Sequence, residues 1–419
     1  MTTKIEPIED LSNKKISNEG FFLKKNHAIF LTVIISFLFA GSILATYFGK
    51  PETVYEKYTY ASETTDTMLI NDAKTIVYVG SYSDRPEGEW LQGKASNYSI
   101  QAYEFIKTDG SLRLLKQYLS DYVGENSIYM TTTKSGDYLY AVNSLIGTNE
   151  ESNVISFRID KKNNGELVKI NSVQGTGGQN AVHISLDENE NFLYIAHYSD
   201  GGALSVYKRN CDGSIGPRVF LDNFNSGNLH NLGQNKILNY ESNELTGQCI
   251  QNPNQLNGLS TEKGPRHLAF HSNGLYAYIV HEFSNDISIL SIDSSSGILS
   301  IVVEKISTLP LGVSSDGQSA GAIRVSLDQK FLYASNRGNT NSISAFRILE
   351  NGRQLSYIGT YDTFGKVPRD FYVLKEHLIV LNQNSANAFT FKINLDGSLT
   401  KSFGPMNIGL PLAIIAVEL

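Results

Sequence analysis

The chain is poor in cysteine, has a single tryptophan and carries no excess of positive charge. Among its 419 residues, Cys211 and Cys249 are the only cysteines, and no Cys/His cluster gives the spacing of a zinc site. The two thiols would pair in an oxidising compartment if they meet, or both stay free, and the sequence leaves both outcomes open. A net charge of −7 argues against a nucleic-acid-binding protein. We expect no metal and no cofactor, since no residue set has a calcium-site or zinc-site pattern.

Long apolar runs are also absent, with one exception near the N-terminus. Residues 28–48, AIFLTVIISFLFAGSILATYF, are 21 residues without a charge, about the length of a membrane-spanning helix. Lys24 and Lys25 precede this run, and positive flanks tend to stay in the cytoplasm. We therefore expect a cytoplasmic tail (1–27), a transmembrane signal anchor (28–48), a linker (49–73) and a lumenal or extracellular remainder. A cleaved signal peptide is the alternative, although its apolar core usually has about 7–15 residues.

From residue 74 onward the chain has no helical period and repeats a strand pattern instead. Apolar runs ending in a small polar cluster, most with a central tyrosine, recur at 76–82, 138–144, 192–198, 276–282, 331–337 and 377–383. An alternating strand follows most of them, and turns such as Asp109-Gly110 and Asp396-Gly397 close the units. Repeats of about 40–50 residues with four short strands predict a β-propeller. We predict an all-β fold: a seven-bladed β-propeller of four-stranded blades over residues 74–419, preceded by one N-terminal transmembrane helix.

One repeat shows how this fold would place chemistry. The stretch GPRHLAFHSNGLYAYIVHEFSND, residues 264–286, predicts strands at 266–270 and 275–281, and a third strand follows at 287–293. In an antiparallel meander, the start of the first strand and the end of the second lie at the same end of the sheet. Arg266 and Glu282 should therefore share one face of the disc near its axis. The same positions of other repeats hold polar residues, namely His183 with His197, Arg369 with Asn382 and Gln383, and Arg337.

Taken singly, each of these residues is explained as well by a structural role, that of a rim side chain capping a neighbouring loop, as by a role in a ligand site. As a set they favour a ligand site, because such sites use a few convergent polar groups.

The quoted segments resemble the lactonase family of seven-bladed propellers, which includes bacterial-type 6-phosphogluconolactonases and fungal carboxymuconate-lactonising enzymes. The resemblance runs from Ile76 to the C-terminus and rests on GPRHLAFHSNGLYAYIVHE, FLYASNRGNTNSISAF and VPRDFYVLKEHLIVLNQNSANAFTF. It implies that Arg266, Glu282 and Arg337 belong to the site, together with a histidine from an earlier blade.

The fourth repeat departs from the family pattern. Between Arg218 and Gly264 the strand that would carry the family histidine is missing, so we expect a shortened fourth blade. An exon missing from the gene model would leave the same gap. His183, in the preceding repeat, matches a different family histidine, and Ala322 stands where relatives usually carry an acidic residue.

The resemblance implies hydrolysis of a small anionic lactone, the cyclic ester of a sugar acid or another carboxylic acid. The expected catalytic residues are Glu282, His183, Arg266 and Arg337, with Glu282 as the base that activates water and His183 or His267 as alternatives. The expected substrate-binding residues are His267, Arg369, Asn382 and Gln383. The alternative is a non-catalytic, membrane-anchored propeller that serves as a binding or scaffold module, with a protein partner that the sequence does not identify.

Overall fold

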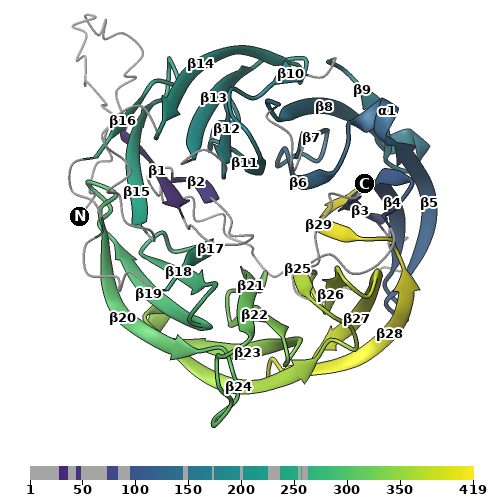
Figure 1. Ribbon diagram of the computed structural model, residues 1–419, viewed down its shortest axis with the longest axis vertical. Helices are drawn as coiled ribbons and strands as arrows, with labels where there is room; N and C mark the ends of the chain where they lie inside the picture. Colours follow the sequence, from purple (N-terminus) through teal and green to yellow (C-terminus); the bar gives the residue numbers. More distant parts are fainter. Residues whose placement is uncertain are drawn as a thin grey trace, which may run out of the picture.

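Seven antiparallel sheets stand around a common axis, each with one edge toward the centre (Figure 1). The computed structural model describes residues 73–83, 95–144, 150–171, 174–198, 202–224, 236–252, 256 and 263–419, together with the backbone of two strands at 28–35 and 44–48. Within these residues six sheets have four strands and one has five. The predicted all-β propeller of four-stranded blades is confirmed.

Blades 1 to 3 follow the chain from residue 75. Blade 1 consists of β29 (Pro411–Glu418), β3 (Thr75–Ser81), β4 (Tyr98–Ile106) and β5 (Ser111–Leu119). The short helix α1 (Ser120–Val123) leads into blade 2, which consists of β6 (Ser127–Thr132), β7 (Tyr138–Asn143), β8 (Asn153–Asp160), β9 (Glu166–Lys169) and β10 (Gln174–Gly175). Blade 3 consists of β11 (Ala181–Leu186), β12 (Phe192–His197), β13 (Ala203–Arg209) and β14 (Ile215–Asn223).

Blades 5 to 7 are each continuous in the sequence. Blade 5 consists of β17 (Pro265–Phe270), β18 (Tyr276–His281), β19 (Asp286–Ile292) and β20 (Leu299–Ser307). Blade 6 consists of β21 (Gln318–Val325), β22 (Phe331–Gly338), β23 (Ser342–Leu349) and β24 (Gln354–Asp362). Blade 7 consists of β25 (Pro368–Val373), β26 (His377–Asn382), β27 (Asn387–Ile393) and β28 (Leu399–Asn407). In each blade the first strand is innermost, as the meander predicted.

The ring closes through its two sequence ends. The C-terminal strand β29 is the innermost strand of blade 1 and pairs antiparallel with β3, near the start of the propeller repeats (Figure 1). Because the last strand completes the first blade, opening the ring requires breaking a whole strand pairing.

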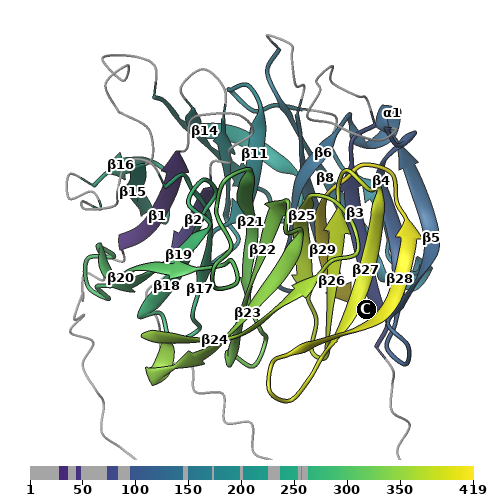
Figure 2. The same ribbon diagram turned by 60° about the horizontal axis from the view of Figure 1, so that its bottom comes forward.

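Blade 4 is assembled from two distant parts of the chain. Its outer strands are β15 (Lys236–Asn243) and β16 (Cys249–Gln251), and its inner strands are β1 (Ala28–Ile35) and β2 (Leu44–Phe48). β1 pairs antiparallel with β15 along its full length, from Ala28 opposite Asn243 to Ile35 opposite Lys236. Both views show the purple β1 and β2 beside the teal β15 (Figures 1 and 2). The expected gap in the fourth blade therefore coincides with the place that β1 and β2 take.

In place of the helix expected over residues 28–48, the structure has these two strands, and residues 36–43 lie outside the described part. Within the part of the chain that the structure describes, no helix is both long and apolar enough to span a membrane. The physical reason for the difference is that a run of β-branched and aromatic residues such as AIFLTVII fits a buried strand as well as a helix. The membrane topology and the domain boundaries stay predictions.

Tyrosines of the second strands join neighbouring blades. The hydroxyl groups of Tyr78, Tyr140, Tyr278 and Tyr333 each donate a hydrogen bond of 2.5–3.0 Å to a glycine carbonyl in the next blade. The receiving glycines lie at the tips of the outer hairpins, where a positive φ (75–105°) favours glycine. The recurring tyrosine of the sequence repeat is thus explained by the seams between blades.

The two cysteines are not paired. Cys211 is exposed and Cys249 is buried in blade 4, and both are free thiols. Burial raises the pKa of the Cys249 thiol to about 12, so this group stays protonated and packs as a small apolar side chain.

Candidate functional site

A β-bulge near the start of the inner strand aims site residues toward the axis. In blades 5 and 7 the pairing register shifts between Pro265 and His267 and between Pro368 and Asp370, which leaves Arg266 and Arg369 as the bulged residues. Bulges often re-aim a side chain beside an active site. The prolines begin these strands, a position where a missing N–H is tolerated. The bulges therefore set the direction of the two arginines.

Arg266, Glu282 and Arg337 form a buried cluster, here called the ionic centre. Arg337 Nη2 donates to Glu282 Oε1 at 2.6 Å and also to the Ala320 carbonyl at 2.6 Å. Arg266 Nε lies 3.9 Å from Glu282 Oε2. The side chains of Arg266, Glu282 and Arg337 are only 2%, 3% and 7% exposed. The structure thus brings together three of the four predicted catalytic residues.

Three polar atoms of the ionic centre have no hydrogen-bond partner within the described residues: Arg266 Nε, Arg337 Nε and Glu282 Oε2. Two of them, Arg266 Nε and Glu282 Oε2, face each other at 3.9 Å. Buried polar atoms are nearly always paired, and exceptions mark strain, chemistry or a bound molecule. One carboxylate oxygen is therefore held by Arg337 while the other is available, next to an available guanidinium N–H.

His267 serves the ionic centre by holding Arg266. Arg266 Nη1 lies 3.1 Å from His267 Nε2, and since a guanidinium only donates, the imidazole nitrogen accepts. Burial, and then the positive charge of Arg266, hold the pKa of His267 well below its ordinary value, so the ring is neutral at pH 7. Burial, and then Arg337, lower the pKa of Arg266 to about 9, against the opposing effect of Glu282.

His183 and Arg369 complete the surroundings. His183, first after the bulge of β11, contacts Tyr129 with ring centroids 4.3 Å apart and the ring planes tilted by 43°. Arg369 is buried and lies within electrostatic reach of Tyr82, Arg337 and Glu282. Its burial lowers its pKa, and Tyr82 acts in the opposite direction.

Three residues near the axis escaped the sequence analysis. Arg324 Nη2 binds both carboxylate oxygens of Asp370, at 3.0 and 3.2 Å, and Tyr129 lies within electrostatic reach of both residues. Asp370 also accepts from the backbone N–H of Ile414, so one carboxylate ties together blades 6, 7 and 1. Tyr129 and Asp370 share a position in the strand register with His183 and His267. Each of the four is the first paired residue after the bulge of its inner strand.

In blade 6 the register shifts between Ala320 and Ile323, so Ala322 lies within the irregular part of the inner strand. The absence of an acidic side chain there leaves Glu282 and Asp370 as the carboxylates of the cluster. Four guanidinium groups, those of Arg266, Arg324, Arg337 and Arg369, face these two carboxylates, which leaves an excess of two positive charges among these described residues.

Two predicted substrate-binding residues, Asn382 and Gln383, have hydrogen-bond partners within the protein, and their role in substrate binding stays a prediction. Asn382 donates through Nδ2 to the Thr363 carbonyl and to Asn387 Oδ1, which fixes the entry into blade 7. Gln383 donates through Nε2 to Asn384 Oδ1, while its Oε1 is buried and has no partner within the described residues. His197, expected beside His183, is fully buried, with Nδ1 3.3 Å from the Ala203 carbonyl. In the described part of the chain no group of three or more His, Cys, Asp and Glu residues is placed to hold a metal ion.

Comparisons with known proteins agree with this architecture. The chain is 29% identical over 357 residues to a protein named 6-phosphogluconolactonase from Formosa agariphila, covering 78% of this chain and 94% of that protein. It is 30% identical over 359 residues to an uncharacterized protein of Staphylococcus epidermidis, covering 78% and 95% of the two chains. Among solved structures, the periplasmic gluconolactonase of Pseudomonas aeruginosa aligns with a TM-score of 0.68 at 24% identity, over 82% of this chain and 99% of that one.

The family model described as "Lactonase, 7-bladed beta-propeller" matches residues 76–230 and 228–415. The two matches meet at the repeat that departs from the family pattern and together span nearly all of the predicted propeller. By its sequence and its fold, the chain belongs to the lactonase family of seven-bladed β-propellers.

Proposed function

We propose that this propeller hydrolyses a small anionic lactone at the ionic centre. The observation that carries the proposal is a pair of buried atoms, Glu282 Oε2 and Arg266 Nε, that lie 3.9 Å apart and make no hydrogen bond within the described residues. Ester hydrolysis needs a base for water and a donor for the oxyanion, close together and shielded from solvent. The name of the Formosa relative supports this reaction class.

In the proposed reaction, Glu282 Oε2 takes a proton from water while the water oxygen forms a bond to the lactone carbonyl carbon. Arg266 Nε donates to the oxyanion of the tetrahedral intermediate. The bond between the carbonyl carbon and the ring oxygen then breaks, and the ring oxygen receives the proton from Glu282. Arg337 holds the other carboxylate oxygen, so the base keeps one orientation through both proton transfers.

The charge around the axis supports an anionic substrate. Two unbalanced positive charges among the four described arginines favour a ligand that brings negative charge, such as a phosphate or a carboxylate. Of these four arginines, Arg369 is the one with no ion pair to a carboxylate in the described residues, and it is therefore our candidate contact for that group.

A panel of lactones tests the proposal. The full chain is assayed with 6-phosphoglucono-δ-lactone, unphosphorylated glucono-δ-lactone and muconolactone, each corrected for spontaneous hydrolysis. We expect turnover of the phosphorylated or carboxylated lactones and at least about tenfold lower kcat/KM for the neutral one, since one charge-assisted pair contributes about 1.5–3 kcal/mol. Absence of turnover across the panel would refute the proposal.

One observation favours the second candidate, a non-catalytic binding module. The inner strand of blade 4, β2, has the sequence LATYF and brings no histidine or charged residue to the axis. Whether residues 28–48 also anchor the chain in a membrane stays a prediction, and the same residues cannot lie in the blade and in a bilayer at once. Specific retention of a protein partner, together with no lactone turnover, would support this candidate.

A further inference from the structure

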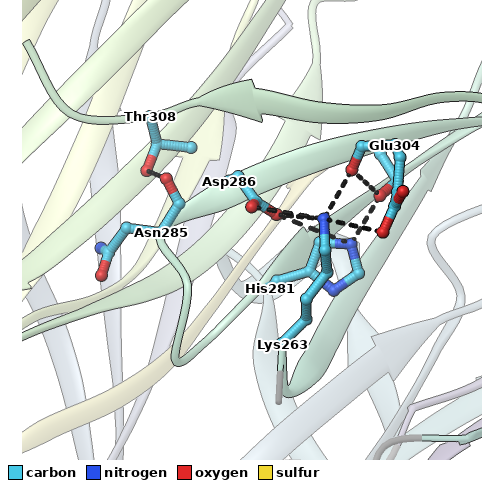
Figure 3. Close-up of polar contacts among 7 residues, drawn as sticks. Lys263, His281, Asn285, Asp286, Glu304 and Thr308 are labelled. Carbon is cyan, nitrogen blue, oxygen red and sulfur yellow. Dashed lines mark hydrogen bonds and ion pairs between the residues drawn. The ribbon is translucent and has the colours of Figure 1, made fainter. Parts of the chain in front are cut away.

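A lysine is buried at the entrance of blade 5, three residues before Arg266. Lys263 is only 5% exposed. Its Nζ donates to the Glu304 carbonyl at 2.8 Å and lies 3.4 Å from both carboxylate oxygens of Asp286 (Figure 3). Asp286 is itself 1% exposed. Burying such a pair costs desolvation of both ions, so its presence beside the ionic centre calls for an explanation.

The backbone of the same lysine holds the turn that follows Glu282. The Lys263 carbonyl accepts from the backbone N–H groups of Phe283 and Ser284, at 3.0 and 3.3 Å. The Gly264 carbonyl accepts from the N–H of Glu282 at 2.6 Å. The segment that leads into Arg266 is therefore bonded directly to the segment that carries Glu282.

Blade 7 has the same backbone link without the ion pair. There Gln383 N donates to the Val367 carbonyl and Asn384 N to the Lys366 carbonyl. Lys366 stands where Lys263 stands in blade 5, and Asn387 takes the place of Asp286. Lys366 is exposed. The backbone link is thus a property of the repeat, whereas the buried lysine and its aspartate distinguish blade 5 from blade 7.

Blade 5 also lacks, within the described residues, a hydrogen bond that blades 6 and 7 make to the end of the preceding blade, and this is the contact that Lys263 replaces. In blades 6 and 7, Asn336 and Asn382 donate to the Thr308 and Thr363 carbonyls, where the preceding blade ends. In blade 5 this place belongs to His281, whose Nε2 instead pairs with Ser288 Oγ at 2.8 Å. Ser288 in turn donates to the Glu304 carbonyl, the same oxygen that accepts from Lys263.

We propose that Lys263 is a positioning residue for the lactonase site proposed above. Its ammonium group ties the strand entry that carries Arg266 to β19 through Asp286 and to β20 through the Glu304 carbonyl. The entry into blade 5 is then fixed by blade 5 itself and does not rely on blade 4. The spacing between Arg266 Nε and Glu282 Oε2 depends on this tie, since a displacement of about 1 Å in such a pair costs about 10²-fold in rate.

A double variant separates positioning from stability. Lys263→Met alone leaves the Asp286 charge buried and unpaired, which is strongly destabilising, whereas Lys263→Met with Asp286→Asn removes both charges. Lys366→Met in blade 7 is the matched control. The full chain and these variants are compared by thermal unfolding, by kcat and KM for 6-phosphoglucono-δ-lactone, and by hydrogen exchange of the Glu282, Phe283 and Ser284 amides.

We expect the double variant to melt near the wild type but to lose about 10- to 100-fold in kcat, with KM changed far less. Its three amides should exchange about tenfold faster, while the Gln383 and Asn384 amides and the Lys366→Met protein stay unchanged. A folded double variant with wild-type kcat and exchange would overturn the proposal. If the double variant does not fold, Lys263→Gln with Asp286→Asn, which also removes both charges but keeps a polar side chain at the buried position, takes its place with the same criteria.

Hydrogen exchange keeps this proposal distinct from the proposed function. If the wild-type chain turns over no lactone, the function proposal fails, and faster exchange at Glu282, Phe283 and Ser284 in the double variant still decides whether Lys263 holds this segment.

Discussion

Blades 4 and 5 are neighbours in the ring, and they differ in sequence continuity, in the length of the outer strand and in the residues that they supply to the ionic centre. Blade 5 is one continuous meander from Pro265 to Ser307, and it supplies Arg266 and Glu282. Blade 4 takes its inner strands from residues 28–48 and its outer strands from residues 236–251, and β16 has only three residues. The comparison teaches that a propeller can keep its architecture while one blade loses sequence continuity, because each blade packs mainly on its two neighbours.

The seam between the two blades shows how the ring tolerates this. At four other seams a tyrosine of the second strand donates to a glycine carbonyl of the next blade. Between blades 4 and 5, Asn239 of the third strand donates to the Gly297 carbonyl at 3.0 Å. The acceptor is again a glycine carbonyl, but the donor is an asparagine side chain of the third strand and not a tyrosine hydroxyl of the second strand.

The largest expected effect concerns the side of blade 5 that faces blade 6. Arg337→Ala removes the hydrogen bonds to Glu282 and to the Ala320 carbonyl, and we expect kcat to fall by at least about 100-fold. The control is Arg347→Ala on the outer part of blade 6, where Nη2 donates to the Asp396 carbonyl. Equal kcat values in both variants would show that the ionic centre is not the reaction site.

The second prediction concerns blade 4. Deleting residues 1–49 removes β1 and β2 and leaves the β15 edge unpaired. We expect the melting temperature to fall by about 10 °C or more, since several kcal/mol are lost from a marginally stable fold. A membrane anchor without a place in the blade predicts the opposite, a truncated chain as stable as the full chain in the same detergent.

Cysteine trapping checks the same pairing directly. Thr32 lies opposite Asn239 in the β1–β15 register, so Thr32→Cys with Asn239→Cys should cross-link on mild oxidation. Thr32→Cys with Ser291→Cys, in blade 5, should not.

The third prediction concerns the histidines of the two blades that flank blade 4, His197 and His281, which stand where blades 2, 6 and 7 have asparagine. Burial lowers the pKa of His197 to about 4, so the folded chain keeps it neutral while the unfolded chain binds a proton below about pH 6.5. Stability is therefore lost as the pH falls, by about 2 kcal/mol at pH 5.

Replacing His197 by the asparagine of blade 2 tests this. In His197→Asn the loss of unfolding free energy between pH 7 and pH 5, measured by urea titration, should be smaller by that amount. Equal losses of unfolding free energy in both proteins would show that the pKa of His197 does not differ between the folded and the unfolded chain.

The smallest expected effects lie at the seams. Tyr278→Phe removes the hydroxyl bond to the Gly352 carbonyl and leaves that buried acceptor unpaired, for a loss of about 1 kcal/mol. Asn239→Ala removes the bond to the Gly297 carbonyl between blades 4 and 5 and should cost about as much if that seam is equally tight. A loss near zero for Asn239→Ala alone would show that the 4–5 seam is looser than the others.

Much of this molecule was predictable from the sequence. The six runs named from the repeat match β3, β7, β12, β18, β22 and β26 to within one residue at each end, because alternation and glycine turns are local signals. The proximity of Arg266, Glu282 and Arg337 followed from the meander. The place of residues 28–48 did not follow, because an apolar run of that length satisfies a helix and two strands alike, and only the open edge of β15 distinguishes them.

The remaining site residues needed three-dimensional register. Asp370 and Tyr129 reach the axis because a bulge shifts their strands, and a bulge has no reliable sequence mark. Lys263 and Lys366 look alike in the sequence, and their difference appears only because Asp286 offers one of them a buried partner and Asn387 does not offer it to the other.

The most direct test of the account is the rate of 6-phosphoglucono-δ-lactone hydrolysis by the full chain and by Glu282→Gln, measured side by side above the spontaneous rate. Glutamine keeps an oxygen for Arg337 but cannot take a proton from water, so the fold should survive and kcat should fall by about 10²–10⁴-fold. Equal rates for the two proteins, or no turnover by the wild type, would contradict the claim that Glu282 is the base of a lactonase.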